Sequence, residues 1–158
     1  MTDASRSVPD WHHLPANPYN PHAWFVGEPE IAEGCWIGAF AVIDGSGGLR
    51  IGRGCDISAG AQIYSHSTVR RVVSERSRPI ERALTVVGNY VHIGAGAVVL
   101  MGANIGDHCV VAAGAVVPQF MQVPAWSVVA GVPGVIRPDA ARRYAAGPSA
   151  AGESDSDE

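Results

Sequence analysis

The sequence contains no lysine, few aromatic residues and no long apolar run. All 11 basic residues are arginines, and aromatic side chains make up only 7% of the 158 residues. No apolar stretch approaches the roughly 20 residues that a membrane-spanning helix needs, and the first ten residues lack the apolar segment of a signal peptide. We therefore expect a cytoplasmic protein with no membrane partner, whose core is built from aliphatic and small side chains.

The cysteine content and the net charge argue against further classes of protein. Three cysteines in a chain without a secretion signal indicate free thiols, and the absence of a Cys-x-x-Cys pair argues against a zinc site. The net charge of -4 gives no reason to expect nucleic-acid binding. The length suits one domain, and 19 glycines with 11 prolines favour many turns over long helices.

An aliphatic or aromatic residue recurs at every sixth position through most of the chain, with two interruptions. The positions are Phe25, Ile31, Ile37, Ile43, Ile51, Ile57, Ile63, Val87, Ile93, Val99, Ile105, Val111, Val117, Val123, Val129 and Val135. A small residue often follows four places later, at Cys35, Ala41, Cys55, Ala61, Ala97, Ala103, Cys109, Ala115 and Ser127. Glycine often follows directly, at Gly38, Gly52, Gly88, Gly94 and Gly106.

A period of six fits neither a helix nor an alternating strand. It fits a short strand followed by a tight corner, with the β-branched residue pointing inward and the small residue filling space near the corner. We expect the glycines to supply the positive φ of sharp corners. One such unit cannot bury its inner face, so successive units must stack.

This pattern resembles the hexapeptide-repeat acyltransferases, which fold as a left-handed parallel β-helix with three hexads per coil. The resemblance spans residues 25–137 and implies an all-β fold of about five coils, with one long inserted loop at residues 67–86. Residues 1–24, rich in proline and aromatic side chains, are expected to cap the first coil. Residues 138–158 are expected to form a largely disordered tail with an acidic end, after a possible helical turn.

His66 is the candidate catalytic residue. Its register points outward, and it stands where the long loop leaves the repeat, a common way to build a site. The stretch Tyr64-Ser65-His66 also resembles the active site of the sugar O-acetyltransferase branch, in which a histidine at this position takes the proton of the acceptor hydroxyl. Tyr64, Ser65 and His92 are expected to line the substrate cleft, and His108 is expected to be a surface corner.

The resemblance also implies acetyl-CoA, or another acyl-CoA, as donor. Small outward residues at Ala95, Ala113 and Gly131 would let the pantetheine arm lie close to the backbone, and Arg137 would hold the phosphates. The closing motif departs from the family pattern, because Gly134 replaces an Ala-Lys pair and a basic residue is thereby lost.

The predicted function is acyl transfer to a hydroxyl of a sugar or nucleotide sugar, by a homotrimer with active sites between subunits and without a metal. Two alternatives remain: a carbonic-anhydrase-like β-helix metalloenzyme with three histidine ligands, and a β-helix scaffold without catalysis. The inserted loop holds five arginines against two glutamates. It either meets an anionic acceptor or packs on a neighbouring subunit.

Overall fold

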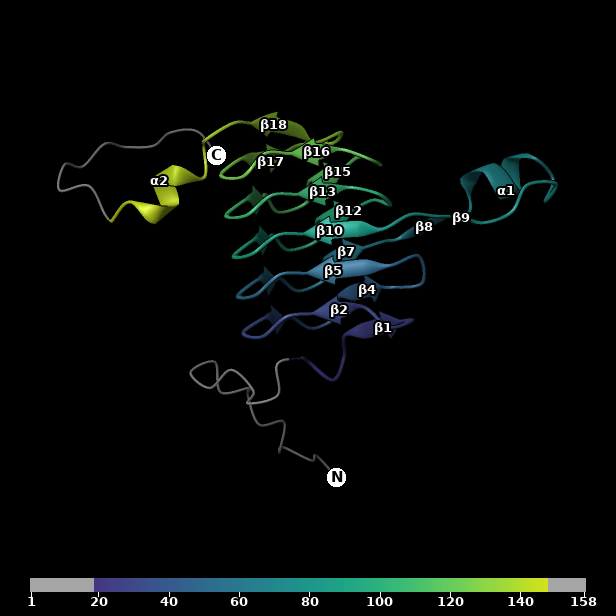
Figure 1. Ribbon diagram of the computed structural model, residues 1–158, viewed down its shortest axis with the longest axis horizontal. Coiled ribbons are helices and arrows are strands. Elements are labelled where there is room, and N and C mark those ends of the chain that lie inside the picture. The colour runs from purple at the N-terminus through teal and green to yellow at the C-terminus, as the bar shows by residue number, and fades with distance from the viewer. Residues whose placement is uncertain (1–18, 148–158) are drawn as a thin grey trace, which may run out of the picture.

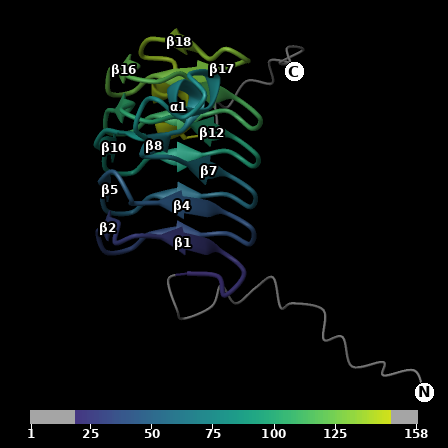
Figure 2. The ribbon, with the colours of Figure 1, turned by 90° about the vertical axis from the view of Figure 1, so that its right-hand side faces the viewer.

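The computed structural model describes residues 19–147, which form a parallel β-helix with three sheets as its sides. Figures 1 and 2 show its stacked coils from the side. Sheet 1 contains β1 (Trp24–Val26), β4 (Val42–Asp44), β7 (Gln62–Ile63), β12 (Val98–Val99) and β15 (Val116–Val117). Sheet 2 contains β2 (Glu30–Ile31), β5 (Leu49–Ile51), β10 (Thr85–Val87), β13 (Asn104–Ile105) and β16 (Gln122–Val123). Sheet 3 contains β3 (Trp36–Ile37), β6 (Asp56–Ile57), β11 (His92–Ile93), β14 (Val110–Val111), β17 (Val128–Ala130) and β18 (Val135–Arg137).

The chain visits the three sheets in turn, so each coil contributes one strand to each sheet. We name the corners by the sheets they join: corner 1–2, corner 2–3 and corner 3–1. Every pair of neighbouring strands within sheets 1 and 2 is parallel, and in sheet 3 only β18 runs antiparallel, against β17. The expected all-β helical fold is thus confirmed for the described part of the chain.

The predicted inward column is confirmed from Ile37 to Val129, where every member is at most 4% exposed. The prediction is wrong at both ends. Phe25 is exposed and Ile31 is only partly buried, because they belong to the first coil and no described coil packs below it. Val135 is 63% exposed, because β18 folds back antiparallel and leaves the register of the repeat.

The glycines that directly follow the inward residues serve close packing rather than positive φ. At Gly94 a Cβ would lie 2.5 Å from the backbone nitrogen of Ala113 in the next coil, although its φ is not positive. Positive φ falls two residues later, at Gly96 with φ +66°. At corner 2–3 the same position of the six-residue repeat holds Tyr90, His108 and Trp126, also with positive φ.

The insertion forms an arm that projects from corner 1–2, away from the prism (Figure 1). It consists of β8 (His66–Ser67), α1 (Val69–Val73) and β9 (Glu81–Arg82), with β8 and β9 antiparallel. Thr85 and Val86, assigned to the loop by the periodicity, belong to β10, because each strand begins before its inward residue. Neither described helix, α1 or α2 (Arg142–Ala145), is long and apolar enough to cross a membrane.

The chain ends fall partly outside the described residues. β1 begins at Trp24, so the last residue of the expected capping segment belongs to the first strand. Tyr19 also pairs with Ile37 through an isolated bridge. The expected helical turn is α2, and the rest of the predicted acidic tail lies beyond residue 147.

A column of buried side chains, polar except for Val91, lines the inside of corner 2–3. Each cysteine donates its Sγ–H to a carbonyl of the next coil: Cys35 to Gly52 at 3.0 Å, Cys55 to Gly88 at 3.0 Å and Cys109 to Pro124 at 3.1 Å. Ser127 continues the column in the last coil, where no further coil offers a carbonyl. Its buried hydroxyl has no hydrogen-bond partner among the described residues.

We therefore predict opposite outcomes for two fully buried serines. Ser127→Ala should leave the free energy of unfolding unchanged or raise it, because it removes an unpaired buried hydroxyl. Ser65→Ala should lower it by about 1–3 kcal/mol, because the Ser65 hydroxyl donates to the Asp44 carbonyl at 2.6 Å and accepts from Gly47 N–H at 2.8 Å. Denaturant unfolding of both variants measures the difference, and an equal loss in both would contradict the assignment.

Candidate active site

His66 is held at the root of the arm by a buried aspartate. The imidazole Nδ1 lies 2.5 Å from Oδ2 of Asp44, and the His66 side chain is 32% exposed whereas that of Asp44 is 1% exposed. Asp44 ends β4, one coil below, at the same corner 1–2. Stacking of the two coils therefore brings together residues that are 22 positions apart.

The Asp44 carboxylate is fixed by several donors. Its Oδ2 accepts from Ser65 N–H at 2.9 Å and its Oδ1 from Ser46 N–H at 3.0 Å. Burial alone would raise the Asp44 pKa, but hydrogen bonds from Ser46, Ser65 and His66 outweigh it and hold that pKa well below its usual range. An ionised carboxylate only accepts, so Nδ1 of His66 donates to it, and in the neutral imidazole Nε2 keeps its lone pair.

The neighbouring predicted cleft residues take different roles. Ser65 is fully buried and belongs to the Asp44 network, so its hydroxyl does not face solvent. Tyr64 is partly buried and donates to Oε1 of Gln62 at 2.6 Å. Its ring meets the His66 ring edge-on, with centroids 6.1 Å apart. Tyr64 therefore forms one wall beside the imidazole.

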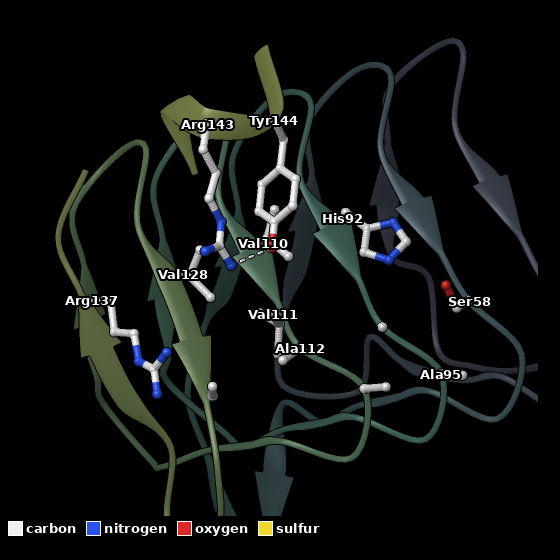
Figure 3. A pocket seen from close by; sticks show the side chains of 13 residues that line it. Ser58, His92, Ala95, Val110, Val111, Ala112, Val128, Arg137, Arg143 and Tyr144 are labelled. Carbon is white, nitrogen blue, oxygen red and sulfur yellow. Dashed lines mark hydrogen bonds between the residues drawn. The ribbon is translucent and has the colours of Figure 1, made fainter. Parts of the chain in front are cut away.

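A groove on the outer face of sheet 3 brings together most of the predicted cofactor residues (Figure 3). Its volume is about 1080 Å³, and its lining includes Ala95, Ala113, Arg137 and His92. Gly131 lies one coil beyond Ala113 at corner 3–1 but does not line the groove.

Helix α2 adds two residues to the groove: Tyr144, which the sequence prediction did not include, and Arg143, which it considered only together with Arg142 as an alternative phosphate site to Arg137. Arg143 and Tyr144 line the groove, and Arg143 Nη2 donates to the Tyr144 hydroxyl at 2.7 Å (Figure 3). Arg142 points elsewhere, because it pairs with Asp139 at 3.0 Å and lies over the Trp126 ring. The repeat pattern ends before α2, so it gave no register for these side chains.

His66 and the groove lie at opposite edges of sheet 1 within one chain. His66 stands at corner 1–2, whereas Ala95 and Ala113 stand at corner 3–1. The lining of the groove does not include Tyr64, Ser65 or His66. A single chain therefore does not bring the predicted catalytic residue to the predicted cofactor residues.

Neither His92 nor His108 lies beside His66. His92 lies exposed on sheet 3, and His108 is stacked at corner 2–3 between the rings of Tyr90 and Trp126, at 5.4 and 4.2 Å. Within residues 19–147, no group of three or more His, Cys, Asp or Glu side chains is arranged to hold a metal ion. The geometry thus offers no support for the three-histidine alternative.

The buried cysteines are poor nucleophiles. Burial raises the pKa of the Cys55 thiol to about 12 and also raises that of Cys109. All three thiols lie inside the prism.

Two family models match the repeat. The bacterial transferase hexapeptide model (six repeats) matches residues 84–119, and the hexapeptide repeat of succinyl-transferase matches residues 31–65. Both matched segments consist of the stacked coils described above. The chain therefore carries the hexapeptide repeat of bacterial transferases in these two segments.

Solved structures share the fold. The N-acyltransferase AntD from Bacillus cereus superposes with a TM-score of 0.60 at 16% identity, covering 75% of this chain and 66% of that one. A maltose O-acetyltransferase from Clostridium difficile 630 superposes with a TM-score of 0.56 at 18% identity, and the match covers 74% of this chain and 66% of that one. A hexapeptide-repeat acetyltransferase from Vibrio cholerae superposes with a TM-score of 0.51 at 25% identity, and the match covers 73% of this chain and 69% of that one. This chain thus spans just under two thirds of the length of the first two.

The Asp44 pKa leads to a prediction about acid stability. Because the folded-state pKa lies below the unfolded-state value, ionised Asp44 stabilises the fold at neutral pH, and this contribution is lost as the pH falls below about 4. The melting temperature of the wild type should therefore fall more steeply from about pH 5 to pH 3 than that of Asp44→Asn.

Asp56→Asn is the matched control, because Asp56 is exposed on the outer face of sheet 3. The melting temperature of Asp56→Asn should fall with pH as steeply as that of the wild type. Parallel melting profiles for the wild type and Asp44→Asn would show that Asp44 does not make this contribution.

Proposed function

We propose that the protein transfers an acyl group, in the first instance acetyl, from coenzyme A to a hydroxyl of a sugar or sugar-containing acceptor. The observation that supports this most directly is the His66–Asp44 pair, a partly exposed imidazole whose Nδ1 is held by a buried carboxylate. Among proteins with the same fold, one is a maltose O-acetyltransferase, and AntD was solved with dTDP and 3-hydroxybutyryl-CoA.

The chemistry follows from the free Nε2 of His66. A thioester carbonyl is already reactive, but a sugar hydroxyl is a poor nucleophile until its proton leaves. Nε2 accepts that proton as the hydroxyl oxygen attacks the carbonyl, and the ionised Asp44 stabilises the resulting imidazolium. When the tetrahedral intermediate collapses, the C–S bond breaks and the imidazolium returns the proton to the leaving thiolate. The transfer is direct, in keeping with cysteines that are buried and have raised pKa values.

The groove on sheet 3 has the chemistry of a coenzyme A site. Ala95 and Ala113 have no bulk beyond Cβ, so an extended pantetheine arm can approach the backbone at corner 3–1. Arg137 and Arg143 supply guanidinium groups for phosphates. These two arginines replace the basic residue that the closing motif of this chain lacks.

Sheet 1 is the face best suited to bind another copy. Its outward residues are Trp24, Val42, Gln62, Val98 and Val116, none of them charged. The outward positions of sheets 2 and 3 include Glu30, Arg50, Asp56 and His92. Three copies arranged around a threefold axis with sheet 1 inward would bring corner 1–2 of each copy beside corner 3–1 of the next. This trimer places His66 of one subunit at the groove of its neighbour.

The function is tested by thiol release from acetyl-CoA with a panel of sugars and nucleotide sugars. His66→Ala should lower kcat by about 10²–10⁴-fold, the usual value of a general base, while leaving assembly and acyl-CoA binding nearly intact. His92→Ala should lower kcat less than His66→Ala does. His108→Ala is the matched control and should keep the wild-type kcat, because His108 lies at another corner. Near-normal turnover by His66→Ala would refute the assigned base.

The assembly is tested by a matched pair of valines. Val98 on sheet 1 and Val86 on sheet 2 both occupy outward, partly buried positions. Val98→Arg should dissociate the trimer and abolish transfer, because a buried guanidinium without a partner is costly. Val86→Arg should remain trimeric and active. Light scattering with activity assays checks both, and a monomeric wild type that is fully active would contradict the intersubunit site.

A further inference from the structure

Arg82 lies directly across the arm from the proposed base. In the antiparallel pairing of β8 and β9, His66 faces Arg82 and Ser67 faces Glu81. The adjacent pair is joined by a hydrogen bond from Ala83 N–H to the Ser65 carbonyl at 3.1 Å. His66 and Arg82 are therefore a non-hydrogen-bonded pair, the type in which opposite Cα atoms are about 4.5 Å apart and side chains are closest.

Both side chains leave the arm on the same side, toward the coil below. His66 reaches Asp44 there, and the Cβ of Arg82 lies 3.1 Å from where a Cβ on Gly47 would stand. Gly47 in turn donates its N–H to the Ser65 hydroxyl. The start of the Arg82 side chain is thus placed by the same corner that places the base.

The Arg82 guanidinium is available to bind a ligand. Arg82 is exposed and forms no ion pair with a described carboxylate, whereas Arg70 on the same arm pairs with Glu81 at 3.4 Å. The buried acid of the same corner, Asp44, already accepts hydrogen bonds from Ser46, Ser65 and His66. A free cation therefore stands beside a base that acts on the acceptor.

We propose that Arg82 determines acceptor specificity by binding an anionic group, a carboxylate or a phosphate, so that the acceptor hydroxyl reaches Nε2 of His66. This inference rests on the proposed acyl transfer and narrows its acceptor to acidic or phosphorylated sugars. The planar fork of arginine suits both kinds of oxyanion. A neutral sugar would leave the guanidinium hydrated, and Arg82 would not increase the affinity for that sugar.

The test compares matched acceptors in the thiol-release assay: methyl glucoside, methyl glucuronide and UDP-glucose, together with the corresponding galactose series. The wild type should give a KM at least about 10-fold lower for an anionic member than for its neutral counterpart. Comparison of the KM for the glucuronide with that for the UDP-sugar identifies whether a carboxylate or a diphosphate is preferred. Arg82→Gln should raise the KM for the anionic acceptor by about 10-fold or more and leave the neutral acceptor unchanged.

Two controls separate specificity from assembly and from general loss of activity. Arg76→Gln makes the same charge change at an exposed position of the arm outside β8 and β9, and should leave KM near the wild-type value. Arg82→Lys should recover part of the preference, because it restores charge without the fork. Light scattering should give the same mass for every variant.

The outcomes are distinguishable. Transfer without preference for anions, an equal loss on neutral and anionic acceptors, or a trimer broken by Arg82→Gln would each overturn the role of Arg82 while leaving acyl transfer in place. Failure of the wild type to release thiol with any acceptor, in this panel and in the wider one, would instead refute the proposed function and this inference with it.

Discussion

The distance between successive coils controls the rest of this structure. Parallel strands must stack about 4.8 Å apart, and the coils meet this spacing through backbone hydrogen bonds such as Gly94 N–H to the Val111 carbonyl at 2.8 Å. At Gly94 this spacing leaves no room for a Cβ against the backbone of Ala113 in the next coil, so glycine is required there. Every inward residue also lies against its equivalent one coil away, and this explains the repeated β-branched column.

The proposed site occurs where this repetition is broken. Corner 1–2 departs from the period in two adjacent coils, first by the extra residues after Ile43 and then by the arm after Ile63. The first departure gives Asp44 a buried position with donors of its own. The second lets His66 leave the prism directly above it. The regular coils then act as a rigid support, so the pair needs no flexible loop to bring it together.

Much of the prism was predictable because the repeat is local, whereas the site depends on contacts between coils. The period of six predicted thirteen inward residues, from Ile37 to Val129, but could not show where stacking ends, so Phe25 and Val135 were misplaced. His66 could be proposed from the loop beside it. Asp44 was not, although the extra residues after it, one coil before the arm, were a usable signal. The tautomer of His66 follows only from that three-dimensional contact.

The separation of the base from the groove gives sheet 1 two roles in the proposed trimer. His66 stands at one edge of this sheet and Ala113 at the other. A face without charge can pack closely on its copies, and the flatness of a parallel sheet fixes how the two edges meet. Any shift of the interface would move the base relative to the thioester, and a misplacement of about 1 Å can cost about 10²-fold in rate. In the proposed trimer, substitutions at Val98 and Val116 would therefore change the rate by shifting the interface, although neither side chain lines the groove.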